Sequence, residues 1–189
     1  LYTSHGILSN TMVAVNSDRR IKKNIVDVPD NLALGMVRNI PCRYYNYIDT
    51  LKRGTETTIG FIAQEVKEVL PSAVIVRDEF IPNVFKKLDN IQWVEDASKN
   101  TFSLKTDEIT DCSGVKYRFF VSDGSGNELK KDVIGNSDNT FTFDSSYNNV
   151  FCYGNKVKDF HSLDKQKLFT LNFSATQEID RIQQQHIID

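Results

Sequence analysis

The chain has 189 residues, of which 40% are hydrophobic and 11% aromatic, enough for one sizeable folded unit or two small ones. Its 23 basic and 25 acidic residues are spread along the chain and give a net charge of -2, which argues against nucleic-acid binding. It has no apolar run near the roughly 18 residues of a membrane span and no signal-peptide pattern, so we expect neither a membrane nor a secretory route.

The opening residues, 1–16, lack a start Met and a clear period, which predicts the end of an upstream segment. A charge-dense run, 17–31, follows them. Asp30 is then a candidate N-cap for a short helix that ends before Pro41. The apolar residues of that helix recur near helical spacing: Leu34, Val37 and Ile40.

Two short runs rich in aromatic and β-branched residues come next, CRYYNYI (42–48) and TIGFI (58–62). The polar stretch between them can turn the chain back, so the sequence predicts a hairpin. From Ile62 the apolar residues shift to helical spacing until Pro71, which predicts a second helix.

Between Ala73 and Gly154 the chain consists of short β-rich runs separated by turn clusters such as DGSGN and GNSDN. The runs are AVIV (73–76), IQWV (91–94), TFSLK (101–105), VKYRFFVS (115–122), TFTF (140–143) and VFCY (150–153). We expect mostly antiparallel sheet.

A long final helix is predicted beyond a turn at Gly154 and Asn155. Its narrow apolar stripe comprises Leu171, Ala175, Ile179, Ile182 and His186, and its glutamines include Gln177, Gln183, Gln184 and Gln185. The stripe could pack on its own domain, but its narrowness favours the seam of a homo-oligomeric bundle. The predicted fold class is therefore α+β, with short N-terminal helices, a β-rich middle and a long C-terminal helix.

Three cysteines, Cys42, Cys112 and Cys152, lie far apart, with no CxxC pair and no His at zinc-like spacing. We expect half-buried thiols in a reducing compartment, and no metal or other cofactor. The three histidines, His5, His161 and His186, are isolated from any Ser or Cys in a triad context, which argues against a conventional hydrolase triad.

The segment SDRRIKKNI (17–25) allows two interpretations. By composition alone it is a Ser cap followed by a solvated basic turn. Together with the hairpin RYYNYI and the helix IGFIAQEVKEVLPSAV, however, it resembles the intramolecular chaperone auto-processing domain, also called peptidase S74. That family ends viral tailspikes, endosialidases and tail fibres, and a related copy occurs in the myelin regulatory factor of animals.

The resemblance is strong over residues 17 to about 76. The segment VKDFHSLDKQKLFTLNFSATQEIDRIQQQ also resembles the closing helix of the versions in large DNA viruses. The resemblance implies that residues 1–16 end a passenger and that 17–189 form the domain, with an insertion at about 77–154.

The family's nucleophile is the serine that opens the motif, Ser17 in this sequence, and its partner lysine stands five positions on, at Lys22. The family cuts just before this serine, which implies cleavage between Asn16 and Ser17. A lysine can take the hydroxyl proton only when its pKa falls well below its solution value, through burial or neighbouring cations. The nearby cations are Arg19, Arg20 and Lys23.

Other residues of the matched region have open roles. Lys23 is the alternative base, although the family spacing favours Lys22. Asp18 could orient Lys22 or stabilise the turn, and Arg20 could support the site. Gln64 and Glu65 could also contribute, or could simply point outward from their helix.

The resemblance implies a single self-cleavage in cis, by a homotrimer that first guides the folding of a fibre-like passenger in the same polypeptide. It places assembly in the host cytoplasm and the passenger in the virion. One alternative is a cleavage-inactive trimerisation or receptor-binding module of a virion fibre. Another is a regulator of the animal type, released from a membrane anchor by the same cut.

Overall fold

The computed structural model describes residues 16–124 and 126–188, and it has the predicted α+β class. Its helices are α1 (Asp30–Asn39), α2 (Thr50–Arg53), α3 (Ala63–Val69) and α4 (Lys165–Ile188), with short 3₁₀ turns η1 (Arg19–Ile21) and η2 (Pro71–Ala73). Its strands are β1 (Arg43–Tyr45), β2 (Thr58–Gly60), β3 (Val74–Phe80), β4 (Lys86–Lys87), β5 (Ile91–Asp96), β6 (Thr101–Thr106), β7 (Lys116–Ser122), β8 (Leu129–Ile134), β9 (Thr140–Phe143) and β10 (Asn149–Leu163).

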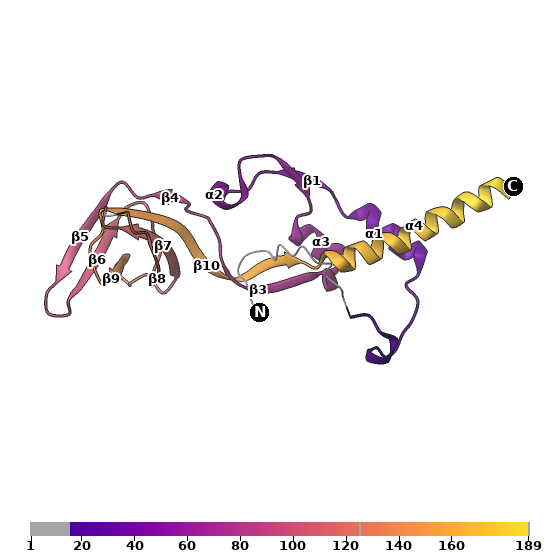
Figure 1. Cartoon of the computed structure of the whole chain (residues 1–189), viewed down its shortest axis with the longest axis horizontal. Coiled ribbons are helices and arrows are strands. Elements are labelled where there is room, and N and C mark those ends of the chain that lie inside the picture. Colours follow the sequence, from indigo (N-terminus) through magenta and orange to yellow (C-terminus); the bar gives the residue numbers. More distant parts are fainter. Residues whose placement is uncertain (1–15, 125, 189) are drawn as a thin grey trace.

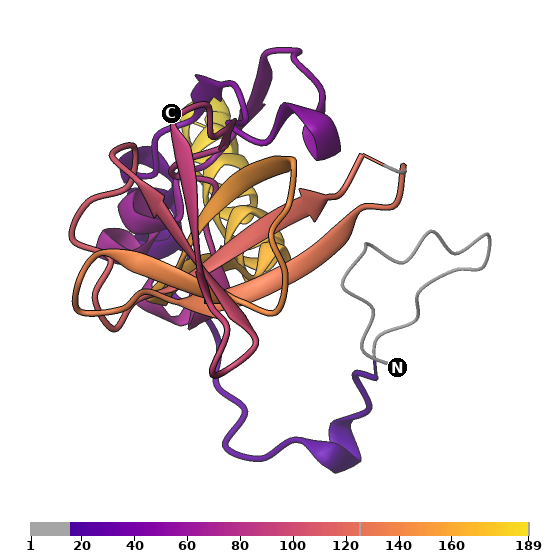
Figure 2. The ribbon, with the colours of Figure 1, turned by 90° about the vertical axis from the view of Figure 1, so that its left-hand side faces the viewer.

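The molecule is elongated, with its helices and most of its strands at opposite ends (Figure 1). Helices α1, α3 and α4 lie at one end, and strands β5 to β9 lie at the other. The long strand β10 runs between the two ends and pairs with β3 on the way. The segment before α1, which we call the N-terminal arm (residues 16–29), lies beside the helical end in Figure 1 and loops out to one side of the molecule in Figure 2.

Helices α1 and α4 pack together through a small apolar core of Ala33, Leu34, Leu171 and Ala175. The predicted cap at Asp30 is wrong, because Asp30 is the first helical residue and its predecessor holds the N-cap position without a side-chain hydrogen bond. The Asp30 carboxylate instead accepts a hydrogen bond of 2.5 Å from the Ser174 hydroxyl of α4. The Asp30 carboxylate, which the sequence suggested as a helix cap, therefore links α1 to α4.

The apolar stripe predicted for α4 packs against its own chain. Leu171 and Ala175 are buried against α1, and Ile182 contacts the same cluster. Ile179 is 42% exposed, and His186 is also exposed. Leu171 and Ala175 therefore pack within one copy, and an oligomer seam along α4 stays a prediction.

Exposed apolar side chains occupy the opposite face of α4. Phe169, Phe173 and Ile187 are 69%, 61% and 82% exposed. At about 100° per residue, these three positions lie within about 40° of one another and roughly opposite Leu171. We call this surface the outer face of α4.

The predicted hairpin is present, with β1 and β2 antiparallel and Arg43 opposite Gly60. Between the strands the chain forms α2, whose first turn is capped by Asp49 through a 3.1 Å bond from the Lys52 N–H. Helix α3 ends at Val69 because Pro71, two residues later, begins the next turn. The sequence therefore predicted the local structure of this region well.

The β-rich middle forms its own core. Strand β7 alternates buried and less buried positions, as expected of a strand with one face against a core. Phe119 and Phe141 are both fully buried, and their rings meet edge to face at 4.9 Å between centroids. In the sheets, β3, β10, β7 and β8 are neighbours in that order, β4 pairs with β10, and β5, β6 and β9 form a separate group.

The turn predicted at Gly154 and Asn155 is wrong, because β10 continues through both residues to Leu163. A register shift between Cys152 and Gly154 marks a bulge in the strand. Gly154 has φ of 148°, and a Cβ atom at this position would lie 2.1 Å from the Ile81 carbonyl oxygen. Glycine therefore allows a close backbone approach inside the strand rather than a chain reversal.

The prediction of half-buried thiols also needs correction. Cys42 is exposed, Cys112 and Cys152 are fully buried, and all three are free thiols. The two buried thiols belong to the core of the β-rich middle. Burial raises the pKa of Cys112, and it raises the pKa of Cys152 to about 12.

Candidate active site

The Ser17 and Lys22 side chains meet in the N-terminal arm. Lys22 Nζ donates a hydrogen bond of 2.6 Å to Ser17 Oγ. The turn η1 lies between these residues and brings them together. This contact places the predicted nucleophile and the predicted base within direct proton-transfer distance.

The direction of that hydrogen bond defines what catalysis still requires. With the ammonium donating, the Ser17 oxygen keeps its own proton. A general base must instead be neutral and accept the hydroxyl proton, which burial or added positive charge would favour for a lysine. The geometry of one copy therefore provides the proximity of the two side chains.

Asp18 and Arg20 form a fork-like ion pair beside the dyad. The Arg20 side chain donates to both oxygens of Asp18, from Nε at 3.0 Å and from Nη2 at 2.7 Å. This pairing, together with the Arg20 backbone N–H, holds the pKa of Asp18 below its ordinary value, and the same carboxylate raises the pKa of Arg20. Asp18 therefore compensates the charge of Arg20, one of the cations near Lys22, and a supporting role for Arg20 stays a prediction.

The whole N-terminal arm is exposed. Residues 16–29 are all on the surface, and its apolar side chains include Ile21 at 67% and Val26 at 84% exposed. Asn24 adopts a left-handed conformation with φ of 55°, which asparagine tolerates well, and redirects the chain after the dyad. In Figures 1 and 2 the arm stands apart from the helices and the strands.

The other predicted site residues lie elsewhere or face other partners. Glu65 pairs with Arg43 of the neighbouring strand, with a shortest N–O distance of 2.8 Å. Gln64 lines a separate groove. Among the described residues, no hydrogen bond links Gln64, Glu65 or Lys23 to Ser17 or Lys22.

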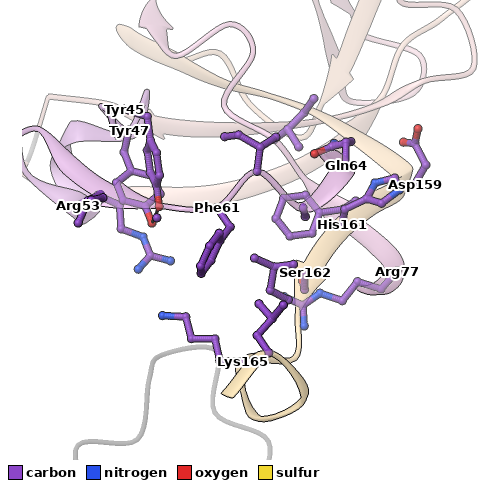
Figure 3. Close-up of a pocket in the computed structure, with 18 of the residues that line it drawn as sticks. Tyr45, Tyr47, Arg53, Phe61, Gln64, Arg77, Asp159, His161, Ser162 and Lys165 are labelled. Atoms are coloured by element: carbon purple, nitrogen blue, oxygen red, sulfur yellow. Dashed lines mark hydrogen bonds between the residues drawn. The ribbon is translucent and has the colours of Figure 1, made fainter. Parts of the chain in front are cut away.

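That groove has a volume of about 1020 Å³. Figure 3 shows Tyr45, Tyr47 and Arg53 on one side of it and Asp159 and His161 on the other. The two tyrosine rings meet edge to face at 5.3 Å between centroids. Sequence reasoning missed this groove because its lining comes from the hairpin, from α3, from β10 and from the start of α4.

The histidines do not gather around a nucleophile. His161 Nε2 lies 3.2 Å from Lys67 Nζ, and its Nδ1 is buried without a hydrogen-bond partner among the described residues. His186 is exposed on α4, and His5 lies outside the described residues. Within residues 16–124 and 126–188, the helices lack the length and apolarity that a bilayer crossing requires.

Comparison with known proteins agrees with the sequence resemblance. Residues 17–75 match the family model described as chaperone of endosialidase, peptidase S74. The chain is also 28% identical, over 217 residues, to the uncharacterized protein VP1 of Micromonas pusilla reovirus (isolate Netherlands/2005). That alignment covers 89% of this chain but only 11% of the viral protein, so the chain spans about a tenth of that relative's length.

These matches confirm the predicted resemblance and its viral context, and they support a chaperone-type role. The matched range begins at Ser17 and includes Lys22, the hairpin and α3. The narrower likeness to the copies of large DNA viruses stays a prediction, as does the division into passenger and domain at Ser17.

Proposed function

From the match of residues 17–75 to the chaperone of endosialidase family, we propose that the chain is a trimeric, self-releasing chaperone domain. It assists the folding of an upstream fibre-like segment of the same viral polypeptide in the host cytoplasm. It then separates from that segment by one cut between Asn16 and Ser17. The observation that carries the proposal is the 2.6 Å contact between Lys22 Nζ and Ser17 Oγ inside the matched segment.

The cleavage proceeds in two steps, formation of an ester on Ser17 Oγ and its hydrolysis. The Ser17 hydroxyl oxygen attacks the Asn16 carbonyl carbon while Lys22 takes the hydroxyl proton. The peptide C–N bond then breaks, the proton passes to the departing Ser17 nitrogen, and Asn16 is held as an ester on Ser17 Oγ. Water hydrolyses this ester, which leaves a carboxylate on Asn16 and a free amine on Ser17.

The extent of exposed surface supports assembly of several copies. The chain exposes 14177 Å², whereas a compact protein of 21.6 kDa exposes about 9,200 Å². Residues outside the described ranges account for at most about 2,700 Å² of this surface, since an unfolded chain exposes about 1.45 Å² per dalton. The remaining excess of about 2,300 Å² is of the size that obligate interfaces bury.

Assembly also offers a reason why cleavage would begin only after several copies have associated. Both dyad side chains are exposed in one copy. A neighbouring copy that covered the N-terminal arm would dehydrate Lys22 and favour its neutral form. Chains that fail to assemble would then retain their chaperone domain, and cleavage would make correct assembly irreversible.

The test compares four precursors that carry the upstream segment: the natural sequence, Ser17→Ala, Lys22→Ala and the matched control Lys23→Ala. We expect no cleavage for Ser17→Ala and a rate at least about a hundredfold lower for Lys22→Ala, the low end of general-base contributions. Lys23→Ala should cleave within a few-fold of the natural rate. Persistent cleavage in both dyad variants would exclude the mechanism, and an intact but trimeric natural chain would favour a cleavage-inactive trimerisation module.

A further inference from the structure

The Ser17 to Lys22 contact needs a compact turn. An extended chain places residues five positions apart at about 16 Å, and an α-helix places them about 140° apart around its axis. In the structure the turn η1 closes the distance through two backbone bonds, from Ile21 N to Asp18 O at 3.2 Å and from Lys22 N to Arg19 O at 3.1 Å. The reactive geometry therefore depends on whether this single turn forms.

The turn has little support apart from Asp18. It contains no buried residue, and it spans only three residues, which is far too short for a stable helix in water. Asp18 stands at its N-cap in an extended conformation, and Asp18 Oδ1 accepts a bond of 2.7 Å from the Arg20 backbone N–H. The Arg20 side chain then clamps the same carboxylate from the other side.

We propose that Asp18 is the positioning residue of the Ser17 and Lys22 dyad, and that it acts as the N-cap of η1. This inference rests on the proposed self-cleavage. The Asp18 carboxylate binds neither the scissile bond nor Lys22 within the described arm, since its oxygens accept hydrogen bonds from the Arg20 backbone and side chain. Its contribution is to hold the turn that brings the two reactive side chains together.

A different role for Asp18 would be electrostatic. A free carboxylate near Lys22 would stabilise the ammonium and so oppose the general base. The fork with Arg20 prevents this, because the charge of Asp18 is balanced at 2.7 Å. The two roles predict different results for Asp18→Asn, because the amide keeps an oxygen that can accept the hydrogen bond from the Arg20 backbone N–H and removes the charge.

The experiment measures the cleavage rate of the precursor against pH for Asp18→Asn, Asp18→Ala and the matched control Asp27→Ala. Asp27 lies in the same exposed arm. Asp18→Ala should cleave about five to ten times more slowly, the usual consequence of a lost cap. Asp18→Asn should stay within about threefold of the natural rate with an unchanged pH profile, and Asp27→Ala should match the natural chain.

Two results would overturn the proposal. If Asp18→Ala cleaves at the natural rate, the cap is irrelevant to the dyad. If Asp18→Asn is as slow as Asp18→Ala, or its pH profile shifts, Asp18 acts through its charge. Failure of the proposed function is distinguishable, because a Ser17→Ala precursor would then cleave like the natural chain.

Discussion

The outer face of α4 offers a test of self-association that spares the fold of the single copy. The double variant Phe169→Ala and Phe173→Ala truncates two rings that are 69% and 61% exposed. Both lie on the side of α4 that α1 does not cover. We therefore expect this variant to weaken a trimer while each copy remains folded.

The expected effect follows from the exposed area. A phenylalanine side chain buries about 200 Å² when fully covered, so about two-thirds of this area, roughly 130 Å², is available to a partner at each ring. At about 25 cal/mol per Å², covering each ring would contribute about 3 kcal/mol as an upper estimate. This corresponds to about a hundredfold in the association constant for each ring.

Sedimentation equilibrium over a range of concentrations measures this change directly. The matched control is Leu171→Ala on the opposite face, where the side chain is 7% exposed and its loss should cost about 2–5 kcal/mol of unfolding free energy. The phenylalanine variant should dissociate with a nearly unchanged unfolding free energy. The reasoning is refuted if that variant sediments as a trimer of natural affinity, or if the natural chain is a monomer.

Two further predictions concern the thiols and the half-buried Tyr153. With an aromatic disulfide reagent at mild alkaline pH, the exposed Cys42 should react quickly. Cys112 and Cys152 should react only after unfolding, because both are buried and their pKa values are raised. Rapid reaction of all three thiols in the folded protein would contradict the burial of these two. Burial and the nearby Asp49 raise the pKa of Tyr153 to about 12, above the ordinary value of about 10. The folded state therefore favours the protonated phenol, whose contribution to stability is complete below pH about 10 and is lost as the pH rises towards 12. Unfolding free energies should therefore fall less steeply over this window in Tyr153→Phe than in the natural chain, and equal slopes would count against the prediction.

The sequence could predict the elements whose signals are local. The hairpin and α3 follow from aromatic and β-branched runs and from Pro71, which stops α3 whatever its surroundings. Strand β8 was missed because its residues, Leu129–Ile134, include two lysines and an aspartate. Its pairing with β7 is a long-range contact that local periodicity does not contain.

Tertiary contacts decided features that local sequence signals did not. Gly154 is a turn signal in isolation, but the approach of the Ile81 carbonyl makes it a bulge within β10. Leu171 and Ala175 have the spacing of an oligomer seam, but both are buried against α1 of the same chain, and a seam along the rest of the stripe stays a prediction. A helix pattern identifies an apolar face without identifying its partner.

The candidate site was predictable only in part. The five-residue spacing and the family resemblance pointed to Ser17 and Lys22, and the structure places their side chains 2.6 Å apart. The role of Asp18 as a cap is also local in origin. The groove beside His161 depends on chain packing, which the sequence alone did not indicate.

The most direct test of the account is the intact mass of the products that the natural precursor releases. The account predicts two fragments whose masses add up to the precursor plus one water, with the downstream fragment starting at Ser17. It also predicts that the downstream fragment appears only in trimeric fractions. Cleavage at any other bond, or in fractions that contain only single chains, would contradict it.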